Sequence, residues 1–484
     1  MEESLKRKVI KGFSWNLVER IGINIIKFII GIILARLLLP KDFGLIGIIT
    51  VFFAVAEILI QGGFMQAYVQ KKSVTDMDSS TVFYTNLSIS LFLYSVLWLV
   101  APFIAKFYKQ DLLVSLIRVM GSVLIINSLS VIQIAKLTRN IYFKHRARIT
   151  VISSLVSGVL GVISALKGLG VWSLVIQQLG NRFLIAVGLW STSSWKPKLQ
   201  FSTSSFSEMF SFGGWLLISA LLKRIFENIY YLMIGKFFSP AWVGFYQKSK
   251  QFSDITSQQI ARVIGDVSFP VFAKLKEDNE KIVHGVRKFL EVSLMVITPL
   301  SIILFVIAEP FVILLLTEKW SPMIPLVKVL SIIGLVLPFR VINYQLLLAQ
   351  GKGRIGFTIS MITNLSRLAN FIITFRFGII YILYGELVIN VLAYLLNARF
   401  INEINNYGFI KQFKDVWRTL LSGAVAAVSG TLMIYSINTD LVIIVFICAI
   451  IIITTYIAMQ YFINRTQMLY MSKIIINIVS KKTL

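Results

Sequence analysis

Apolar runs of roughly 20 residues recur along the whole chain, each long enough to cross about 30 Å of hydrocarbon as an α-helix. Because only short polar connections separate these runs, the chain cannot fold as a water-soluble domain. A membrane β-barrel needs alternating segments of about 10 residues, and the sequence does not show that alternation. The pattern therefore predicts an all-α protein that crosses the membrane many times.

The apolar runs predict about fourteen membrane-spanning helices. Their approximate bounds are residues 12–37, 43–69, 79–105, 112–135, 148–166, 169–190, 211–237, 243–272, 286–316, 324–348, 355–377, 379–400, 417–437 and 441–463. Composition agrees, since hydrophobic residues make up 57% of the chain and charged residues 14%, whereas a soluble domain has about 25% charged residues.

The formal net charge of +26 at pH 7 comes from Lys and Arg residues concentrated in alternate connections between the apolar runs. Lys136, Arg139 and Lys144 lie in one of these connections, and Lys274 and Lys276 lie in another. Cytoplasmic loops of membrane proteins carry this positive excess, so the charge does not indicate nucleic-acid binding. The pattern predicts a bacterial-type cytoplasmic membrane protein with both termini in the cytoplasm.

An internal repeat is visible at a fixed offset of 200 residues. Trp15 matches Trp215, Pro40 matches Pro240, and Gly44 matches Gly244. Six predicted spans separate the matched points, so two halves would enter the membrane in the same direction, related by a pseudo-two-fold axis along the membrane normal. We therefore predict four parts: an N-terminal six-helix lobe (1–205), a C-terminal six-helix lobe (206–400), two additional membrane helices (401–463) and a cytoplasmic amphipathic tail (464–484).

Several short motifs resemble those of bacterial polysaccharide and lipopolysaccharide flippases, which belong to the multidrug/oligosaccharidyl-lipid/polysaccharide exporter superfamily. They are Gly-Phe-Ser-Trp-Asn at 12–16, Pro-Lys-Asp-Phe-Gly-Leu at 40–45, Arg-Asn-Ile-Tyr-Phe-Lys at 139–144, and Gly-Leu-Gly-Val-Trp-Ser-Leu-Val at 168–175. The resemblance implies two six-helix lobes around a central cavity that opens alternately to either side. It also implies a glycan substrate joined through pyrophosphate to a polyprenyl lipid.

Charged and polar residues form helical stripes inside three of the predicted spans. Steps of three and four residues place them on one face of each helix. The stripes are Asn16, Arg20, Asn24 and Lys27 in the first span, Ser219, Lys223, Glu227 and Tyr231 in the seventh, and Gln247, Gln251, Asp254, Gln258 and Arg262 in the eighth. Since ionisable groups within a membrane face protein or water, the stripes predict a hydrated, positively charged cavity.

The candidate substrate-binding residues are the cations of these spans, because guanidinium and ammonium groups suit a pyrophosphate. They are Arg20, Lys27, Lys223, Arg224, Arg262 and Arg340. The alternative is that these cations pair with Glu19, Glu227, Asp254 or Asp266 and only hold helices together. Lys27 and Glu227 occupy equivalent positions of the repeat, which suggests a contact between them.

Coupling to an ion gradient requires a carboxylate whose occupancy differs between two conformations. The candidates are Glu57, Glu227, Asp254 and Asp266, with Glu291 and Glu386 as further possibilities. Related drug exporters couple to Na⁺ or H⁺, so both ions stay open. We expect no other cofactor, no metal site and no ATP hydrolysis, because the chain has no Walker-type glycine loop.

The sequence is best interpreted as that of a flippase, rather than an enzyme, for a lipid-linked oligosaccharide in cell-surface polysaccharide biosynthesis. A polysaccharide polymerase and glycosyltransferases are the expected protein partners. Three alternatives remain: an ion-coupled multidrug exporter of the same superfamily, a membrane enzyme of polysaccharide assembly, and a structural assembly subunit. The excess of Lys and Arg in the spans argues against the exporter of cationic drugs, and the short loops leave little room for a catalytic domain.

Overall fold

The computed structural model describes residues 2–61, 64–71, 73–140, 142–436, 439–465, 467–469 and 472. This part of the chain is helical, with seventeen α-helices, one π-helix and two 3-10 helices and no strand. Nine membrane-span candidates in this part of the chain are helices long and apolar enough to cross a bilayer. The predicted all-α, multi-pass membrane fold is therefore confirmed, whereas the count of fourteen spans stays a prediction.

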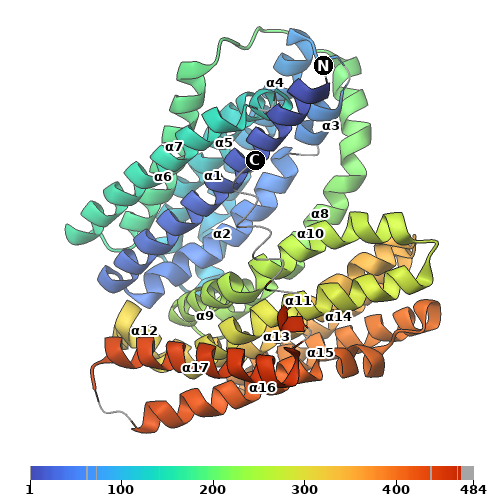
Figure 1. Ribbon diagram of the computed structural model, residues 1–484. Coiled ribbons are helices and arrows are strands. Elements are labelled where there is room, and N and C mark those ends of the chain that lie inside the picture. The colour runs from blue at the N-terminus through green and yellow to red at the C-terminus, as the bar shows by residue number, and fades with distance from the viewer. Residues whose placement is uncertain are drawn as a thin grey trace. The chain divides into compact units, whose positions relative to one another are not determined.

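The chain divides into two compact units, Met1–Gln247 and Lys248–Leu484, here called the N-terminal and C-terminal units. The helices of the N-terminal unit are α1 (Glu2–Leu37), α2 (Pro40–Gln61), α3 (Phe64–Gln70), α4 (Asp76–Tyr108), α5 (Leu112–Arg139), α6 (Phe143–Leu166), α7 (Trp172–Thr192) and α8 (Thr203–Phe237), followed by the start of α9 (Pro240–Ser253). Helix α6 packs between α1 and α7, α5 contacts both α4 and α7, and α2 lies against α8 (Figure 1).

The C-terminal unit continues from α9 through the π-helix η1 (Asp254–Gln258) into α10 (Gln259–Leu275). It then contains α11 (Asn279–Val306), α12 (Ala308–Leu316), η2 (Glu318–Met323), α13 (Ile324–Ala349), α14 (Gly353–Thr374), η3 (Phe375–Phe377), α15 (Ile379–Asn405), α16 (Phe409–Ser436) and α17 (Leu441–Ile463). Helix α13 is central, with contacts to α10, α11 and α15. Leu290, Leu294, Ile342 and Leu346 form its apolar core with no exposed surface.

The final two helices are joined to this unit by buried amides as well as apolar contacts. Helix α16 packs on α11 and α17, and its Gln412 forms a reciprocal pair of hydrogen bonds with Asn343 of α13, both 3.1 Å long. Neither side chain has measurable exposure. In the apolar interior of a membrane protein, each amide satisfies polar atoms that would otherwise cost several kcal/mol.

Helix boundaries repeat at the offset seen in the sequence. Helix α1 ends at Leu37 and α8 at Phe237, while α2 begins at Pro40 and α9 at Pro240. Proline suits the first position of a helix because its missing N–H would have no partner there. Both helices therefore begin three residues before the spans predicted at 43 and 243.

Two predicted spans are interrupted. The span predicted over 43–69 consists of α2 and α3, with residues 62 and 63 between them outside the described part of the chain. The span predicted over 243–272 changes to π-helical hydrogen bonding at Asp254–Gln258 before continuing as α10. A π-helical turn widens the helix locally and often marks a functional position.

Most of the amphipathic tail predicted at 464–484 lies outside the described residues.

The equivalent starts of α2 and α9 cross at two glycines of the repeat. A Cβ added to Gly44 would lie 1.5 Å from the carbonyl oxygen of Pro240, and a Cβ added to Gly244 would lie 2.0 Å from the carbonyl oxygen of Pro40. Only glycine permits so close a backbone approach. The two contacts are reciprocal, which is the arrangement that a local two-fold axis relating the two helix starts would produce.

Candidate functional site

The predicted stripe on α8 presents its charges on an exposed surface. The side chain of Lys223 is 76% exposed, and those of Arg224 and Glu227 are about half exposed. Glu227 lies 3.9 Å from the Lys223 ammonium and 3.7 Å from the Arg224 guanidinium. These loose pairs join neighbours on one helix face, so they leave the cations accessible to a ligand.

The suggested contact between Lys27 and Glu227 is wrong. Glu227 pairs with Lys223 and Arg224 of its own helix, because residues three and four apart on a helix already lie side by side. Lys27 is an exposed residue of α1. The side chain of Arg20, earlier on the same helix, lies outside the described part of the structure.

The polar span α9–η1–α10 carries its hydroxyl groups and its charges in different environments. Ser253 is buried and donates to the carbonyl oxygen of Leu330 on α13 at 2.9 Å. Ser257, also buried, donates to the carbonyl oxygen of Ser253 at 2.8 Å. By contrast, Arg262 and Asp266 of α10 are exposed. Asp254, the first residue of the π-helix, is half-buried. Ser253 therefore joins this span to α13, and α10 presents two charges on its surface.

Arg340 lies in a different environment from the exposed cations. It is half-buried on α13, where it donates to Asn390 of α15. Asn390 also donates to Glu386 at 2.9 Å. The same carboxylate accepts two hydrogen bonds, of 2.8 and 3.0 Å, at Oε1 from Arg367 of α14. This network joins α13, α14 and α15, so for Arg340 the structure shows a helix-holding contact. Its role as a substrate cation stays a prediction.

Two further carboxylates are also paired. Glu19 of α1 is buried and accepts from Arg146 at 3.1 Å and from Thr150 at 3.0 Å, which joins α1 to α6. Glu291 accepts a hydrogen bond from Lys288 at 2.9 Å within α11. Glu19 thus holds helices together, but its partner is Arg146 rather than one of the candidate cations. Arg146 precedes the span predicted from 148, because α6 begins earlier, at Phe143.

Glu57 of α2 lies at a hollow inside the N-terminal unit. Its Oε1 atom accepts from Asn127 of α5 at 2.7 Å and lies 3.7 Å from a guanidinium nitrogen of Arg182 on α7. A cavity of about 230 Å³ opens beside these three residues. The sequence indicated Glu57 as a candidate, but it gave no sign that Asn127 and Arg182 would lie beside it.

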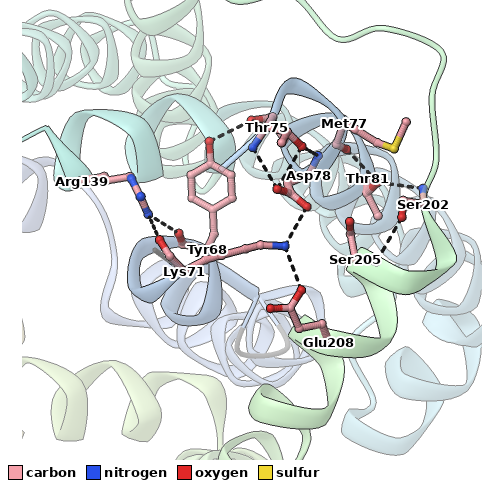
Figure 2. Close-up of polar contacts among 11 residues, drawn as sticks. Tyr68, Lys71, Thr75, Met77, Asp78, Thr81, Arg139, Ser202, Ser205 and Glu208 are labelled. Carbon is pink, nitrogen blue, oxygen red and sulfur yellow. Dashed lines mark hydrogen bonds and ion pairs between the residues drawn. The ribbon is translucent and has the colours of Figure 1, made fainter. Parts of the chain in front are cut away.

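Sequence reasoning missed a cluster at the junction of α3 and α4, here called the Lys71 cluster (Tyr68, Lys71, Thr75, Asp78, Arg139 and Glu208; Figure 2). The Lys71 ammonium lies 3.1 Å from Asp78 and 2.8 Å from Glu208 of α8. The Glu208 carboxylate raises the pKa of Lys71 above its ordinary value. Lys71 and Glu208 are 137 residues apart, and no local pattern connects positions so distant.

The backbone around Lys71 is also held in place. Thr75 and Asp78 form a capping box at the start of α4, with hydrogen bonds of 3.1 and 2.9 Å. Arg139 donates to the carbonyl oxygens of Tyr68 and Val69 at the end of α3. These contacts satisfy helix-end groups that have no partner within the helix. The cluster therefore fixes the first turns of α8 to the α3–α4 connection.

More than half of the chain matches a known protein family. The family model, described as "Polysaccharide biosynthesis protein", matches residues 33–325. The chain belongs to this family. The match begins within α1 and extends into α13, so it includes every candidate residue except Arg20, Lys27, Arg340 and Glu386.

Curated relatives are identical to the chain at about a quarter of the aligned residues. The teichuronic acid biosynthesis protein TuaB of Bacillus subtilis is 25% identical over 356 residues, which are 73% of this chain and 74% of the relative. The lipopolysaccharide biosynthesis protein WzxC of Escherichia coli is 23% identical over 356 residues, or 73% of this chain and 72% of the relative. The succinoglycan biosynthesis transport protein ExoT of Rhizobium meliloti is 23% identical and aligns with 67% of this chain and 66% of the relative.

Solved structures share the fold at low sequence identity. The lipid II flippase MurJ in an inward closed conformation has a TM-score of 0.74 at 15% identity and aligns with 94% of this chain and 99% of the MurJ chain. An inward-facing multidrug transporter of the MATE family has a TM-score of 0.62 at 14% identity, over 79% of this chain and 96% of its own. The chain therefore shares the fold of these two transporters.

Proposed function

We propose that the chain moves a polyprenyl-pyrophosphate-linked oligosaccharide across the bacterial cytoplasmic membrane by alternating access, for the synthesis of a cell-surface polysaccharide. One observation carries the proposal: among the candidate residues on helices predicted to span the membrane, exposed cations outnumber exposed carboxylates. Of these candidates, the exposed cations are Lys27, Lys223, Arg224 and Arg262, and the exposed carboxylates are Glu227 and Asp266. The relatives named for polysaccharide biosynthesis and transport support the same class of substrate.

Exposure of these groups requires water. A charge that faces lipid at mid-membrane costs at least a few kcal/mol, so Lys223 at 76% exposure would destabilise α8 unless it met a hydrated surface. A hydrated surface with excess positive charge attracts a pyrophosphate, and the planar donors of an arginine bind its oxygens in pairs. The polyprenyl tail, which is apolar, would remain in the bilayer while the charged head crosses.

The finer parts of the proposal concern energy, orientation and partners. We infer coupling to a Na⁺ or H⁺ gradient through one of the carboxylates Glu57, Glu227, Asp254 and Asp266. Both termini are expected in the cytoplasm, where a polymerase and glycosyltransferases of the same pathway would work alongside a chain that is itself no enzyme. The rival function, export of cationic drugs, would require an acidic surface, and the exposed cations oppose it.

The proposal can be tested with the full-length protein in proteoliposomes. The measurement is the rate at which a fluorescent polyprenyl-pyrophosphate-linked oligosaccharide becomes accessible to a reagent on the opposite side. We expect K223A combined with R262A to lower this rate at least tenfold. The matched control is R399A, which removes an exposed arginine that pairs with Glu403 along α15, and it should leave the rate unchanged.

Two results would overturn the flippase assignment. The first is a rate that the wild-type protein does not raise above that of protein-free vesicles. The second is transport of a cationic dye with no movement of the lipid-linked glycan, which would make the chain a drug exporter.

A further inference from the structure

The hollow beside Glu57 lies among the helices of the N-terminal unit, and the Arg182 side chain that lines it is 47% exposed. Its walls come from α2, α3, α5 and α7, and its volume is about 230 Å³. Arg182 lies midway along α7, and Asn127 lies midway along α5. Both positions correspond to the middle of a membrane-spanning helix, where a polar hollow is costly unless it serves a ligand or water.

The polar groups of this hollow retain free bonding capacity. Asn127 donates to Oε1 of Glu57 at 2.7 Å, while Arg182 approaches the same oxygen only to 3.7 Å. That distance is too long for a hydrogen bond. Within the described part of the chain, neither Oε2 of Glu57 nor the guanidinium of Arg182 has a hydrogen-bond partner. The site therefore offers an acceptor and several donors at one place.

Apolar side chains also line the hollow. Ile60 and Val131 lie one helical turn beyond Glu57 and Asn127 on the same helices, and Ile134 lies on α5 as well, so a ligand there would meet hydrogen-bonding groups together with hydrocarbon. A pyranose ring has this character, because its hydroxyl groups lie around the edge and its C–H groups form an apolar face. Pockets for drug-sized ligands measure about 300–1,000 Å³, so a hollow of about 230 Å³ suits a single sugar ring.

Charge argues against a cation as the ligand. The positive charge of Arg182 offsets that of the Glu57 carboxylate, and Lys27 of α1 adds a second positive charge near Arg182. A metal ion would be repelled by these cations at close range. The described residues also contain no group of three acidic, histidine or cysteine side chains that could hold a metal.

We propose that Glu57, Asn127 and Arg182 form a sugar-binding subsite within the N-terminal unit, which receives one pyranose unit of the glycan during translocation. The Glu57 carboxylate accepts from a sugar hydroxyl, Arg182 and Asn127 donate to ring or hydroxyl oxygens, and the isoleucines pack against the C–H face. The subsite rests on the proposed flippase function, and it adds a contact to the sugar beyond any contact to the pyrophosphate.

The test uses the full-length chain with a single reporter thiol. Cys448 is the only cysteine of the sequence, so I185C in a C448A background places one reactive thiol at the rim of the hollow. The rate of N-ethylmaleimide labelling is measured with D-glucose, N-acetylglucosamine or D-glucuronate at 100 mM. Mannitol, an open-chain polyol, controls for osmotic effects.

We expect at least one pyranose to slow labelling at least twofold while mannitol does not. Adding E57Q or R182M should abolish this protection, whereas E403Q, on the exposed pair of α15, should preserve it. Equal labelling rates with and without every pyranose would overturn the subsite, as would protection that persists in E57Q and R182M. If the thiol does not react at all, the same sugars must raise the Tm of the wild-type chain but not of E57Q, and no such difference would equally overturn it.

The subsite and the flippase function can fail separately. Proteoliposomes that move the lipid-linked glycan, with no protection of the thiol by any sugar, would refute the subsite alone. Sugar protection that depends on Glu57, in a protein that moves no lipid-linked glycan, would refute the flippase function and leave a sugar-binding site.

Discussion

Gly44 and Pro240 belong to different halves of the internal repeat, yet the Cα atom of Gly44 faces the Pro240 carbonyl oxygen so closely that an added Cβ would lie 1.5 Å from it. Gly244 faces Pro40 in the same way. The two helix starts can therefore meet only while both glycines are present.

Alanine at either glycine should disrupt this crossing. We expect G44A and G244A each to lower the Tm of the purified protein and to reduce glycan translocation, because the backbone oxygen cannot move aside as a flexible side chain could. The control is G180A on α7, where an added Cβ would lie 3.7 Å from the nearest atom, an ordinary contact. Alanine there should be neutral or stabilising, by up to about 1 kcal/mol. Equal effects of all three variants would contradict the special role of the crossing.

A disulfide can test whether the crossing must separate during transport. A Cβ at Gly47 would lie 3.0 Å from Cγ1 of Val243, which matches the approach of two cysteine side chains in a disulfide. We expect G47C combined with V243C, in the C448A background, to form the bond under mild oxidation and to stop translocation, with recovery after reduction. The single cysteine variants are the controls. Full activity of the oxidised double variant would show that α2 and α9 stay together throughout the cycle.

Removing one charge of the Arg367–Glu386 ion pair should strongly destabilise the protein. Glu386 is buried and accepts from Arg367 and Asn390, so E386Q leaves an arginine without its counter-charge. We expect a loss of about 3–5 kcal/mol in the free energy of unfolding. The comparison is E403Q, which breaks an exposed pair with Arg399 and should cost about 0–1 kcal/mol. Similar losses for the two variants would mean that the Arg367 pair is solvated.

Within the Lys71 cluster, the two carboxylates should differ in their contribution to stability. Asp78 is buried, completes the capping box of α4 by accepting from the backbone of the N-cap Thr75, and contacts Lys71, whereas the Glu208 side chain is 61% exposed. D78A should therefore destabilise the protein by about 1–2 kcal/mol through the broken capping box, and E208A by less than about 1 kcal/mol. Denaturant unfolding of both variants measures the two losses in the free energy of unfolding. A larger loss for E208A than for D78A would contradict the capping argument.

The sequence predicted those features that depend on local patterns. Hydrophobic length predicted the all-α, multi-pass fold, and the repeat of Pro40 at Pro240 corresponds to two helix starts, three residues before the spans predicted from 43 and 243. The four-residue steps placed Lys223 and Arg262 on single faces of α8 and α10, and both residues are exposed, whereas the cavity that the stripes were expected to line stays a prediction. Each of these features follows from residues within a few turns of one helix.

Features that depend on residues far apart in sequence escaped prediction. Nothing near Glu57 indicates that Asn127 and Arg182 would line the same hollow, and nothing near Lys71 indicates Glu208. The expected contact between Lys27 and Glu227 failed for a related reason. Equivalence within a repeat does not imply proximity, and Glu227 already had cations one helical turn away.

The amide pair between Gln412 and Asn343 determines how separable the final helices are. A protein shortened before α16 would leave the Asn343 amide with two unmet hydrogen bonds, on a helix that also borders α10, α11 and α15. The hairpin of α16 and α17 thus supports the helices that precede it. A chimera that exchanges this hairpin between family members would need a residue at position 343 that can bond with position 412.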